Sequence, residues 1–268
     1  MIGRISTLLY GIFCYLAFFA TFLYAIAFLG DFGVPRTIDS GVEGSIGRAL
    51  AINAGLLALF AVQHSIMARS WFKRAWTRIV PPAAERSTYV LFSSVALILL
   101  FWQWRPIGGL VWQVDNELAR MAIVWIYAAG WMLLLIATFM INHFDLFGLR
   151  QVYLRFRGQE YTGLSFRTPG LYRVMRHPIY FSWLCIFWAT PRMTVAHLVF
   201  ALATTAYILI AIQLEERDLI RGYGDTYRRY KQQVPSILPV RFGRASSISQ
   251  IPAPGSGAEP QPVEFSGD

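Results

Sequence analysis

Four long apolar runs, separated by short polar segments, fill the first half of the chain. They cover residues 5–30, 49–67, 87–104 and 118–141. An α-helix needs about 20 apolar residues to cross the hydrocarbon core of a bilayer, so each run predicts a membrane-spanning helix. The first run is longer than the roughly 7–15 apolar residues in the core of a cleaved signal peptide, which predicts a retained helix.

The second half of the chain has a different pattern. A polar region covers residues 146–176, and a short apolar segment at 179–190 is followed by Pro191 and a longer apolar segment. At a rise of 1.5 Å per residue, the short segment cannot cross a bilayer alone. We therefore expect a helical hairpin with arms at 171–190 and 193–216, the first arm beginning outside the membrane.

Composition supports a membrane environment. Hydrophobic residues make up 56% of the 268 residues and charged residues only 15%, against about 25% charged in soluble domains. The net charge of +9 comes from basic residues between the apolar runs, which favours contacts with a lipid bilayer over nucleic-acid binding. Cys14 and Cys185 each lie inside an apolar run, so neither a disulfide framework nor a metal site is expected.

The distribution of charge predicts the topology. The segments at 69–86, at 146–176 and after residue 216 are rich in Arg and Lys, whereas those at 31–48 and 105–120 hold few basic residues, mixed with acids. The two kinds alternate, as the positive-inside rule requires, and both termini are then cytoplasmic. The predicted fold is an all-α, polytopic integral membrane protein with four spans plus a C-terminal helical hairpin; the sequence leaves the oligomeric state open.

Two pairs of polar residues close apolar runs on the predicted cytoplasmic side. Gln63 and His64 lie near the end of the second run, and Asn142 and His143 follow the fourth. An imidazole there can accept a proton near neutral pH. The structural alternatives are a headgroup-facing histidine for His64 and an ordinary helix end for Asn142-His143.

The ends of the predicted hairpin carry the other candidates. Arg176, His177 and Pro178 open its first arm, and Glu215 and Glu216 close its second. Two carboxylates at a helix C-terminus face an unfavourable dipole and need cationic or hydroxyl partners. The alternative for the opening is an interfacial helix start, with Pro in the first turn and a basic side chain reaching the headgroups.

An aromatic stripe follows these carboxylates. Tyr223, Tyr227 and Tyr230 recur on one face of a short helix. Such a stripe usually packs, but it can also cover a planar ring. Arginine, paired carboxylates and aromatic faces suit a zwitterionic nucleoside, while the chain has neither a G-x-G-x-x-G motif nor a P-loop.

These motifs resemble the isoprenylcysteine carboxyl methyltransferase superfamily. The matching stretches are Arg-His-Pro-Ile-Tyr at 176–180, Glu-Glu-Arg-Asp-Leu at 215–219, the tyrosine segment at 223–230 and Val-Pro at 234–235. Ser182 replaces a glycine of the family pattern. The resemblance implies S-adenosylmethionine as the methyl donor, bound by Tyr172, Arg176, His177, Pro178, Tyr180, Glu215, Glu216, Tyr227 and Tyr230.

The N-terminal half extends the resemblance. Residues 63–69 are similar to NnrU-like bacterial membrane proteins, whereas 141–151 and 187–194 look closer to the bacterial methanethiol S-methyltransferase family. That implies a bacterial inner-membrane enzyme that methylates a small thiol, methanethiol, to dimethyl sulfide. A thiolate is the attacking species, so we expect His64 or His143 to act as the base, with Gln63 or Asn142 as polar support.

Two other functions remain as alternatives. One is methylation of an isoprenylcysteine carboxylate or another lipid-borne acceptor. The other is a non-enzymatic membrane protein or transporter, which would place polar groups at mid-membrane rather than at one surface. The expected organisation is an acceptor-side region at 1–145, a cofactor-binding region at 146–244 and a disordered tail at 245–268.

Overall fold

The computed structural model describes residues 2–41 and 44–238, so the tail predicted at 245–268 lies outside the described residues. The elements in chain order are α1 (Ile2–Leu29), α2 (Ile46–Met67), α3 (Ser70–Trp76), α4 (Pro82–Gln103), β1 (Leu110–Gln113), α5 (Glu117–Ile141), α6 (His143–Leu146), α7 (Leu149–Arg157), the 3-10 helix η1 (Gly170–Arg173), α8 (Pro178–Trp188), β2 (Arg192–Thr194) and α9 (Val195–Gln233).

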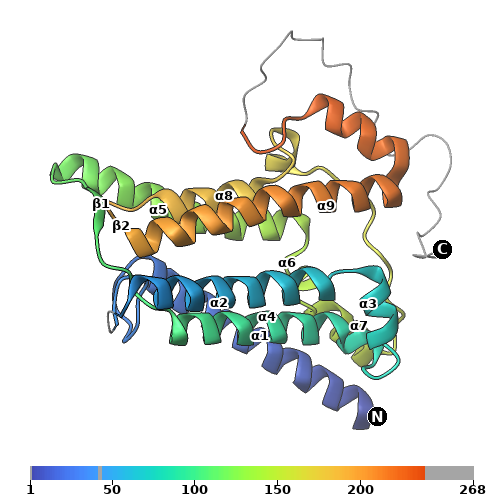
Figure 1. Cartoon of the computed structure of the whole chain (residues 1–268). Coiled ribbons are helices and arrows are strands. Elements are labelled where there is room, and N and C mark those ends of the chain that lie inside the picture. Colours follow the sequence, from blue (N-terminus) through green and yellow to red (C-terminus); the bar gives the residue numbers. More distant parts are fainter. Residues whose placement is uncertain (1, 42–43, 239–268) are drawn as a thin grey trace.

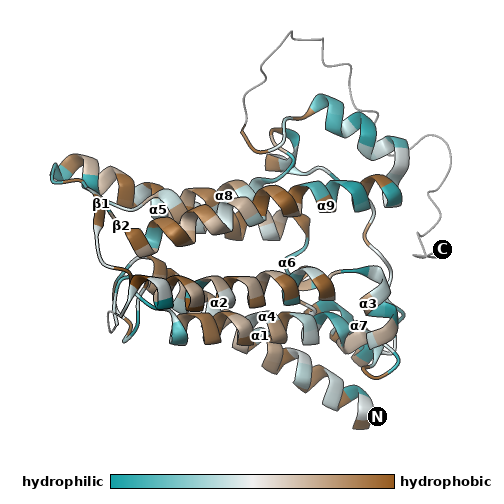
Figure 2. Cartoon of the chain, in the orientation of Figure 1, coloured by the Kyte–Doolittle hydropathy of each residue, from teal (hydrophilic) through white to brown (hydrophobic). Residues whose placement is uncertain are grey.

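Helices of membrane-spanning length confirm the predicted all-α membrane fold. Within the described residues, α1, α2, α4, α5 and α9 are long and apolar enough to cross a bilayer, and α8 is a shorter apolar helix of 11 residues. Figure 2 shows apolar residues along the bodies of the long helices and polar ones at the end that holds α3, α7 and the last part of α9. The chain is an integral membrane protein.

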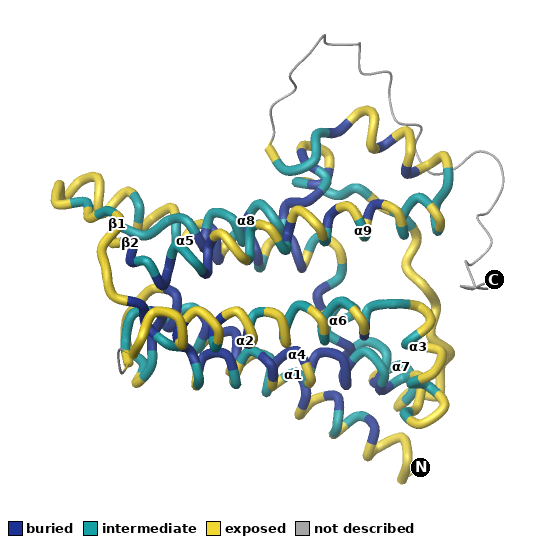
Figure 3. Tube along the Cα trace, viewed as in Figure 1, coloured by how far each residue is buried: buried dark blue, intermediate teal, exposed yellow. Residues whose placement is uncertain are grey.

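The helices form two layers (Figure 1). One layer contains α1, α2 and α4, and the other contains α5, α8 and α9. Aromatic side chains join the layers: Phe22 packs edge-on against Trp131 at 5.1 Å, and Trp104 against Phe200 at 5.6 Å. Buried residues line the facing sides, whereas much of the outer surface is exposed (Figure 3).

A small antiparallel sheet at one end of the bundle corrects an expectation. We expected residues 105–120 to form a loop, but Leu110–Gln113 pairs with Arg192–Thr194, the turn of the C-terminal hairpin. The Thr194 hydroxyl also donates to Asp39 in the α1–α2 connection. The sheet therefore fastens three connections together at the end opposite the Arg-rich segments.

The C-terminal hairpin forms as predicted, with later boundaries for its first arm. Only η1 forms near residue 171, and α8 begins at Pro178, whose missing N–H costs nothing in a first helical turn. Eleven residues of helix extend about 17 Å, roughly half the thickness of the hydrocarbon core. Gly130 of α5 allows α8 to approach closely, because a Cβ there would lie 2.9 Å from Ile186 Cγ1.

Helix α9 continues beyond its apolar part and bends at Gly224. This residue has φ 53° and ψ −129°, a conformation that glycine adopts without steric cost. The bend turns the last part of α9 back over the start of α8 (Figure 1). The bend thereby brings the tyrosine stripe and Lys231 to the Arg176 segment, beside which Glu216 lies on the straight part of α9.

Candidate active site

A buried charge cluster lies where α8 begins and α9 bends. The Glu216 carboxylate is 3% exposed. Its Oε1 accepts from Arg176 Nε at 2.8 Å and lies 3.1 Å from His177 Nε2, while Lys231 Nζ is 2.7 Å from Oε2. A buried carboxylate is tolerated only when such partners replace its lost hydration, so Glu216 is the charge around which this region is built.

Arg176 also holds the end of the described chain. Its Nη1 donates to the carbonyl of Lys231 at 2.9 Å and to that of Val234. The backbone N–H groups of Arg176 and His177 donate to Pro235 and Ser236 at 2.9 and 3.0 Å. The Arg-His-Pro segment thus fixes the segment that follows α9 against the start of α8.

The two adjacent glutamates face different environments. Glu215 is exposed, and its Oε2 accepts from the Tyr180 hydroxyl at 2.8 Å. Tyr180 in turn lies beside the His177 ring, with 5.5 Å between ring centroids. The carboxylate that a ligand can reach is therefore Glu215, while Glu216 serves the internal cluster.

The tyrosine stripe packs inward. Tyr227 and Tyr230 are 2% and 7% exposed and surround Phe166 from the α7–η1 connection. The Tyr230 hydroxyl donates to the carbonyl of Tyr172 at 2.6 Å. These contacts correspond to the packing alternative. They fix the last part of α9 against Tyr172 and Phe166.

His64 lies in a second polar group, between α2 and α4. The Tyr89 hydroxyl is 2.7 Å from His64 Nε2, and Ser93 Oγ is 3.2 Å from His64 Nδ1. Gln63 donates from Nε2 to Met67 Sδ at 3.1 Å and to Ser93 at 3.5 Å. His64 is of intermediate burial as a residue, and its ring stacks on Phe60 with 5.1 Å between ring centroids.

His143 and Asn142 occupy a separate position at the end of α5. The His143 ring is 4% exposed, with Tyr15 Oη 2.9 Å from Nε2 and Thr138 Oγ1 2.9 Å from Nδ1. Burial lowers the pKa of His143, so the ring is neutral near pH 7. Asn142 accepts from the backbone N–H of Asp145 at 3.1 Å and caps α6. Both residues serve the local fold in this structure.

Two contacts between the layers connect the His64 region with α9. Ser65 Oγ lies 3.1 Å from Tyr207 Oη, and Arg69 forms an ion pair with Asp218 at 2.8 Å. Asp218 stands two residues beyond Glu216 on α9. The His64 group and the Glu216 cluster are thus carried on helices that touch each other near the Arg-rich end.

Sequence reasoning missed two partners that complete these groups. Lys231 neutralises Glu216, and Tyr89 binds the His64 ring. A signal existed for Tyr89, because Tyr89 and Ser93 are four residues apart and share one face of α4. Lys231 is 15 positions from Glu216 and becomes its neighbour only through the bend at Gly224.

Comparisons with known proteins identify the class to which the chain belongs. Residues 124–226 match the family model described as phospholipid methyltransferase. The matched region contains α8, the Arg176 segment and the Glu215-Glu216 pair. The fold and this match define the protein as an integral membrane methyltransferase.

Curated relatives identify the family more closely. A methanethiol S-methyltransferase of Crocosphaera subtropica is 54% identical over 89% of this chain and 93% of its own length. The methanethiol S-methyltransferase 2 of Bradyrhizobium diazoefficiens is 52% identical (91% and 94%), and the Mycobacterium tuberculosis enzyme of the same name is 53% identical (88% and 97%). The chain belongs to this methanethiol S-methyltransferase family. No solved structure matches it.

Proposed function

We propose that the protein transfers a methyl group from S-adenosylmethionine to methanethiol and releases dimethyl sulfide. The observation that carries this proposal is the identity of 52–54% with enzymes named for that acceptor, over more than nine tenths of their length. Identity of that extent covers both the Arg176–Glu216 region and the helices that carry His64 and His143.

The groups around the start of α8 fit a zwitterionic nucleoside donor. The exposed Glu215 carboxylate can accept from hydroxyl or ammonium groups, and the Tyr180 ring beside it offers an aromatic face. Lys231, 42% exposed, presents a cation for a carboxylate. When bound, S-adenosylmethionine supplies a methyl group on a positively charged sulfur, while the Glu216 cluster holds Arg176, His177 and Lys231 in place.

We assign acceptor activation to His64 rather than His143. His64 is the less buried residue of the two, and its helix contacts α9 through the Ser65–Tyr207 and Arg69–Asp218 pairs, whereas His143 is 4% exposed. His64 takes the proton from the thiol, and Tyr89 and Ser93 orient its ring. The thiolate sulfur then forms a bond to the methyl carbon as the bond from that carbon to the donor sulfur breaks.

We further propose a bacterial inner-membrane location with the Arg-rich end in the cytoplasm. The described chain begins at this end of the bundle (Figure 1), and the basic segments 69–86 and 146–176 include α3 and α7, which lie there too. This orientation follows the positive-inside rule, and it exposes Glu215 to the cytosol, where a soluble donor is available.

A direct assay tests the proposal. Purified protein in lipid nanodiscs is incubated with S-adenosylmethionine and methanethiol, and dimethyl sulfide is measured in the headspace. We expect product that depends on both substrates. Absence of dimethyl sulfide together with methylation of a prenylcysteine would instead assign the protein to a lipid-borne acceptor.

A further inference from the structure

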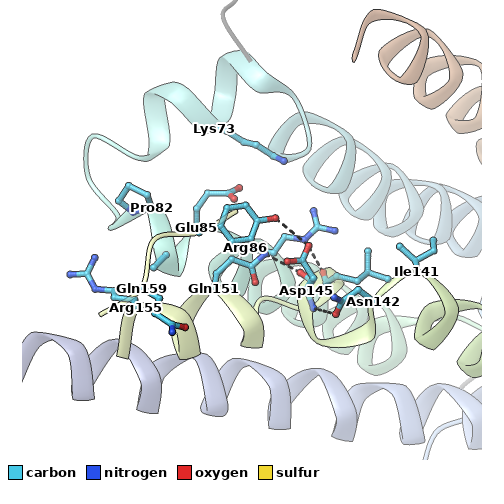
Figure 4. Close-up of a pocket in the computed structure, with 13 residues that line it drawn as sticks. Lys73, Pro82, Glu85, Arg86, Ile141, Asn142, Asp145, Gln151, Arg155 and Gln159 are labelled. Atoms are coloured by element: carbon cyan, nitrogen blue, oxygen red, sulfur yellow. Dashed lines mark hydrogen bonds between the residues drawn. The ribbon is translucent and has the colours of Figure 1, made fainter. Parts of the chain in front are cut away.

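A pocket of about 540 Å³, with several charged and amide side chains in its lining, lies between α3, α4 and α7, away from the Arg176 cluster. Helices α3, α4 and α7 and the end of α5 form its walls (Figure 4). Its lining includes Lys73, Glu85, Arg86, Asp145, Gln151 and Arg155. The proposed methyl transfer uses none of these side chains.

Two cations converge on this pocket. Figure 4 shows Lys73 reaching over it from α3, with the Arg86 side chain extending from α4 on the same side. Burial lowers the pKa of the Lys73 ammonium, and the nearby Arg86 charge lowers it further, against a smaller opposite effect of Glu85. Two like charges drawn out of water toward each other favour an anion between them.

The acidic residues of the pocket do not supply that anion in full. Asp145 pairs with Arg150 at 2.8 Å and accepts from Tyr161 at 3.3 Å, so its charge is already matched. Among the ion pairs of residues 2–41 and 44–238, none includes Glu85 or Lys73. Lys73 and Arg86 thus share the pocket with one carboxylate, that of Glu85, which forms no ion pair within the described residues.

Two buried polar atoms of the lining also lack partners within the described chain. They are Arg155 Nε, a donor, and Gln151 Oε1, an acceptor. Buried polar groups are nearly always hydrogen-bonded. These two atoms leave hydrogen-bonding capacity in the lining that a polar ligand can use.

The position of the pocket identifies the source of such an anion. The pocket lies where α5 ends at Ile141 and α4 begins at Pro82, which is the level at which two spans leave the apolar core. Ile141 lines the pocket and is 45% exposed, and Ile79 just before α4 is 79% exposed. Basic pockets between transmembrane helices at this depth bind the head groups of acidic lipids.

We propose that this pocket is a binding site for a phosphate group, supplied by an anionic phospholipid of the surrounding leaflet. Lys73 and Arg86 bind the phosphate oxygens. Arg86 is already oriented by the bond from its Nε to the carbonyl of Leu146 at 2.7 Å. Occupation of the site would tie α3, α4 and the end of α5 together.

The test measures the apparent Tm of the full-length protein in a zwitterionic detergent. Phosphatidylglycerol, phosphatidylcholine or inorganic phosphate is added in separate arms. We expect phosphatidylglycerol to raise the Tm of the wild type by about 4 °C or more, since a ligand that binds only the folded state stabilises it. Lys73→Gln should lose most of that shift, and Arg74→Gln, an exposed neighbour on α3, should keep it.

The arms separate the sources of phosphate. A Lys73-dependent shift with phosphatidylglycerol alone assigns the site to lipid, and an equal Lys73-dependent shift with inorganic phosphate assigns it to a soluble anion. Equal shifts in wild type and Lys73→Gln, or none in the wild type, would overturn the proposal. Each variant is compared with its own lipid-free Tm, and Lys73→Arg should retain the shift.

Discussion

Glu216 and Glu215, adjacent in sequence, have separate tasks. Glu216 is buried against Arg176, His177 and Lys231, whereas Glu215 is exposed beside Tyr180. Replacing each in turn therefore distinguishes the internal contacts of Glu216 from the ligand contact proposed for Glu215.

Glu216→Gln should lower both stability and cofactor binding. Removing the charge leaves Arg176 and Lys231 facing each other, and breaking a buried pair costs about 3–5 kcal/mol, with the lower end expected because Lys231 is 42% exposed. The measurements are the apparent Tm and calorimetric binding of S-adenosylmethionine. Glu215→Gln is the matched control, with an unchanged Tm and weaker binding. A wild-type Tm for Glu216→Gln would contradict the internal role.

His64→Ala should retain cofactor binding and lose turnover by about 10²–10⁴-fold, the usual contribution of a positioned general base. Initial rates of dimethyl sulfide formation and cofactor calorimetry provide the two readouts. Tyr89→Phe should lower turnover by a smaller factor, because it removes only the hydroxyl beside Nε2. Full activity in His64→Ala would transfer the role to another group or remove the need for a base.

For individual residues, the sequence indicated most of the candidate side chains but not the side chains that contact them. Polar side chains near the ends of apolar runs draw attention because burial in lipid is costly. Their partners depend on helix rotation and on the bend at Gly224, which brings Lys231 to Glu216. The pattern also left open whether Tyr227 and Tyr230 cover a ligand, whereas the structure shows them packed around Phe166.

At the scale of elements, the junction between α6 and α7 depends on one glycine. Gly148 has φ 86°, and a Cβ there would lie 2.6 Å from the backbone nitrogen of Ser87 in α4. Gly148→Ala should therefore destabilise the protein by about 1–3 kcal/mol, seen as a lower apparent Tm. Gly163→Ala, where a Cβ has open space, is the control. Equal melting of the two variants would refute the close approach.

The long helices were predictable from the sequence because each apolar run is long and bounded by charged or turn residues, whereas α3, α6 and α7 lie in polar segments for which no helix was predicted. The β1–β2 sheet was not, since Leu110–Gln113 and Arg192–Thr194 are too short to show an alternating pattern and lie about 80 positions apart. The tyrosine stripe predicted a short helix at 223–230, but the helical stretch 217–222 that joins it to the apolar arm was missed, because that stretch lies beyond the apolar run.

For the whole molecule, the charge distribution predicts which end faces which compartment. In a background without Cys14 and Cys185, Ser45→Cys should react with a membrane-impermeable maleimide on intact spheroplasts, because it lies at the end opposite the Arg-rich segments. Ser165→Cys, exposed in the basic segment, should react only after permeabilisation. The reverse pattern would invert the proposed orientation.

The β1–β2 sheet also bears on how the protein is made. Arg192–Thr194 lies at the tip of the last hairpin, and its partner Leu110–Gln113 is synthesised about 80 residues earlier. If insertion into the membrane follows synthesis, β1 crosses the bilayer first and stays unpaired. It can pair only after α8 and α9 have inserted and β2 has reached the same side. Pairing of the strands then marks completed translocation of the hairpin. Any later step that requires the two helix layers to be packed against each other follows this pairing.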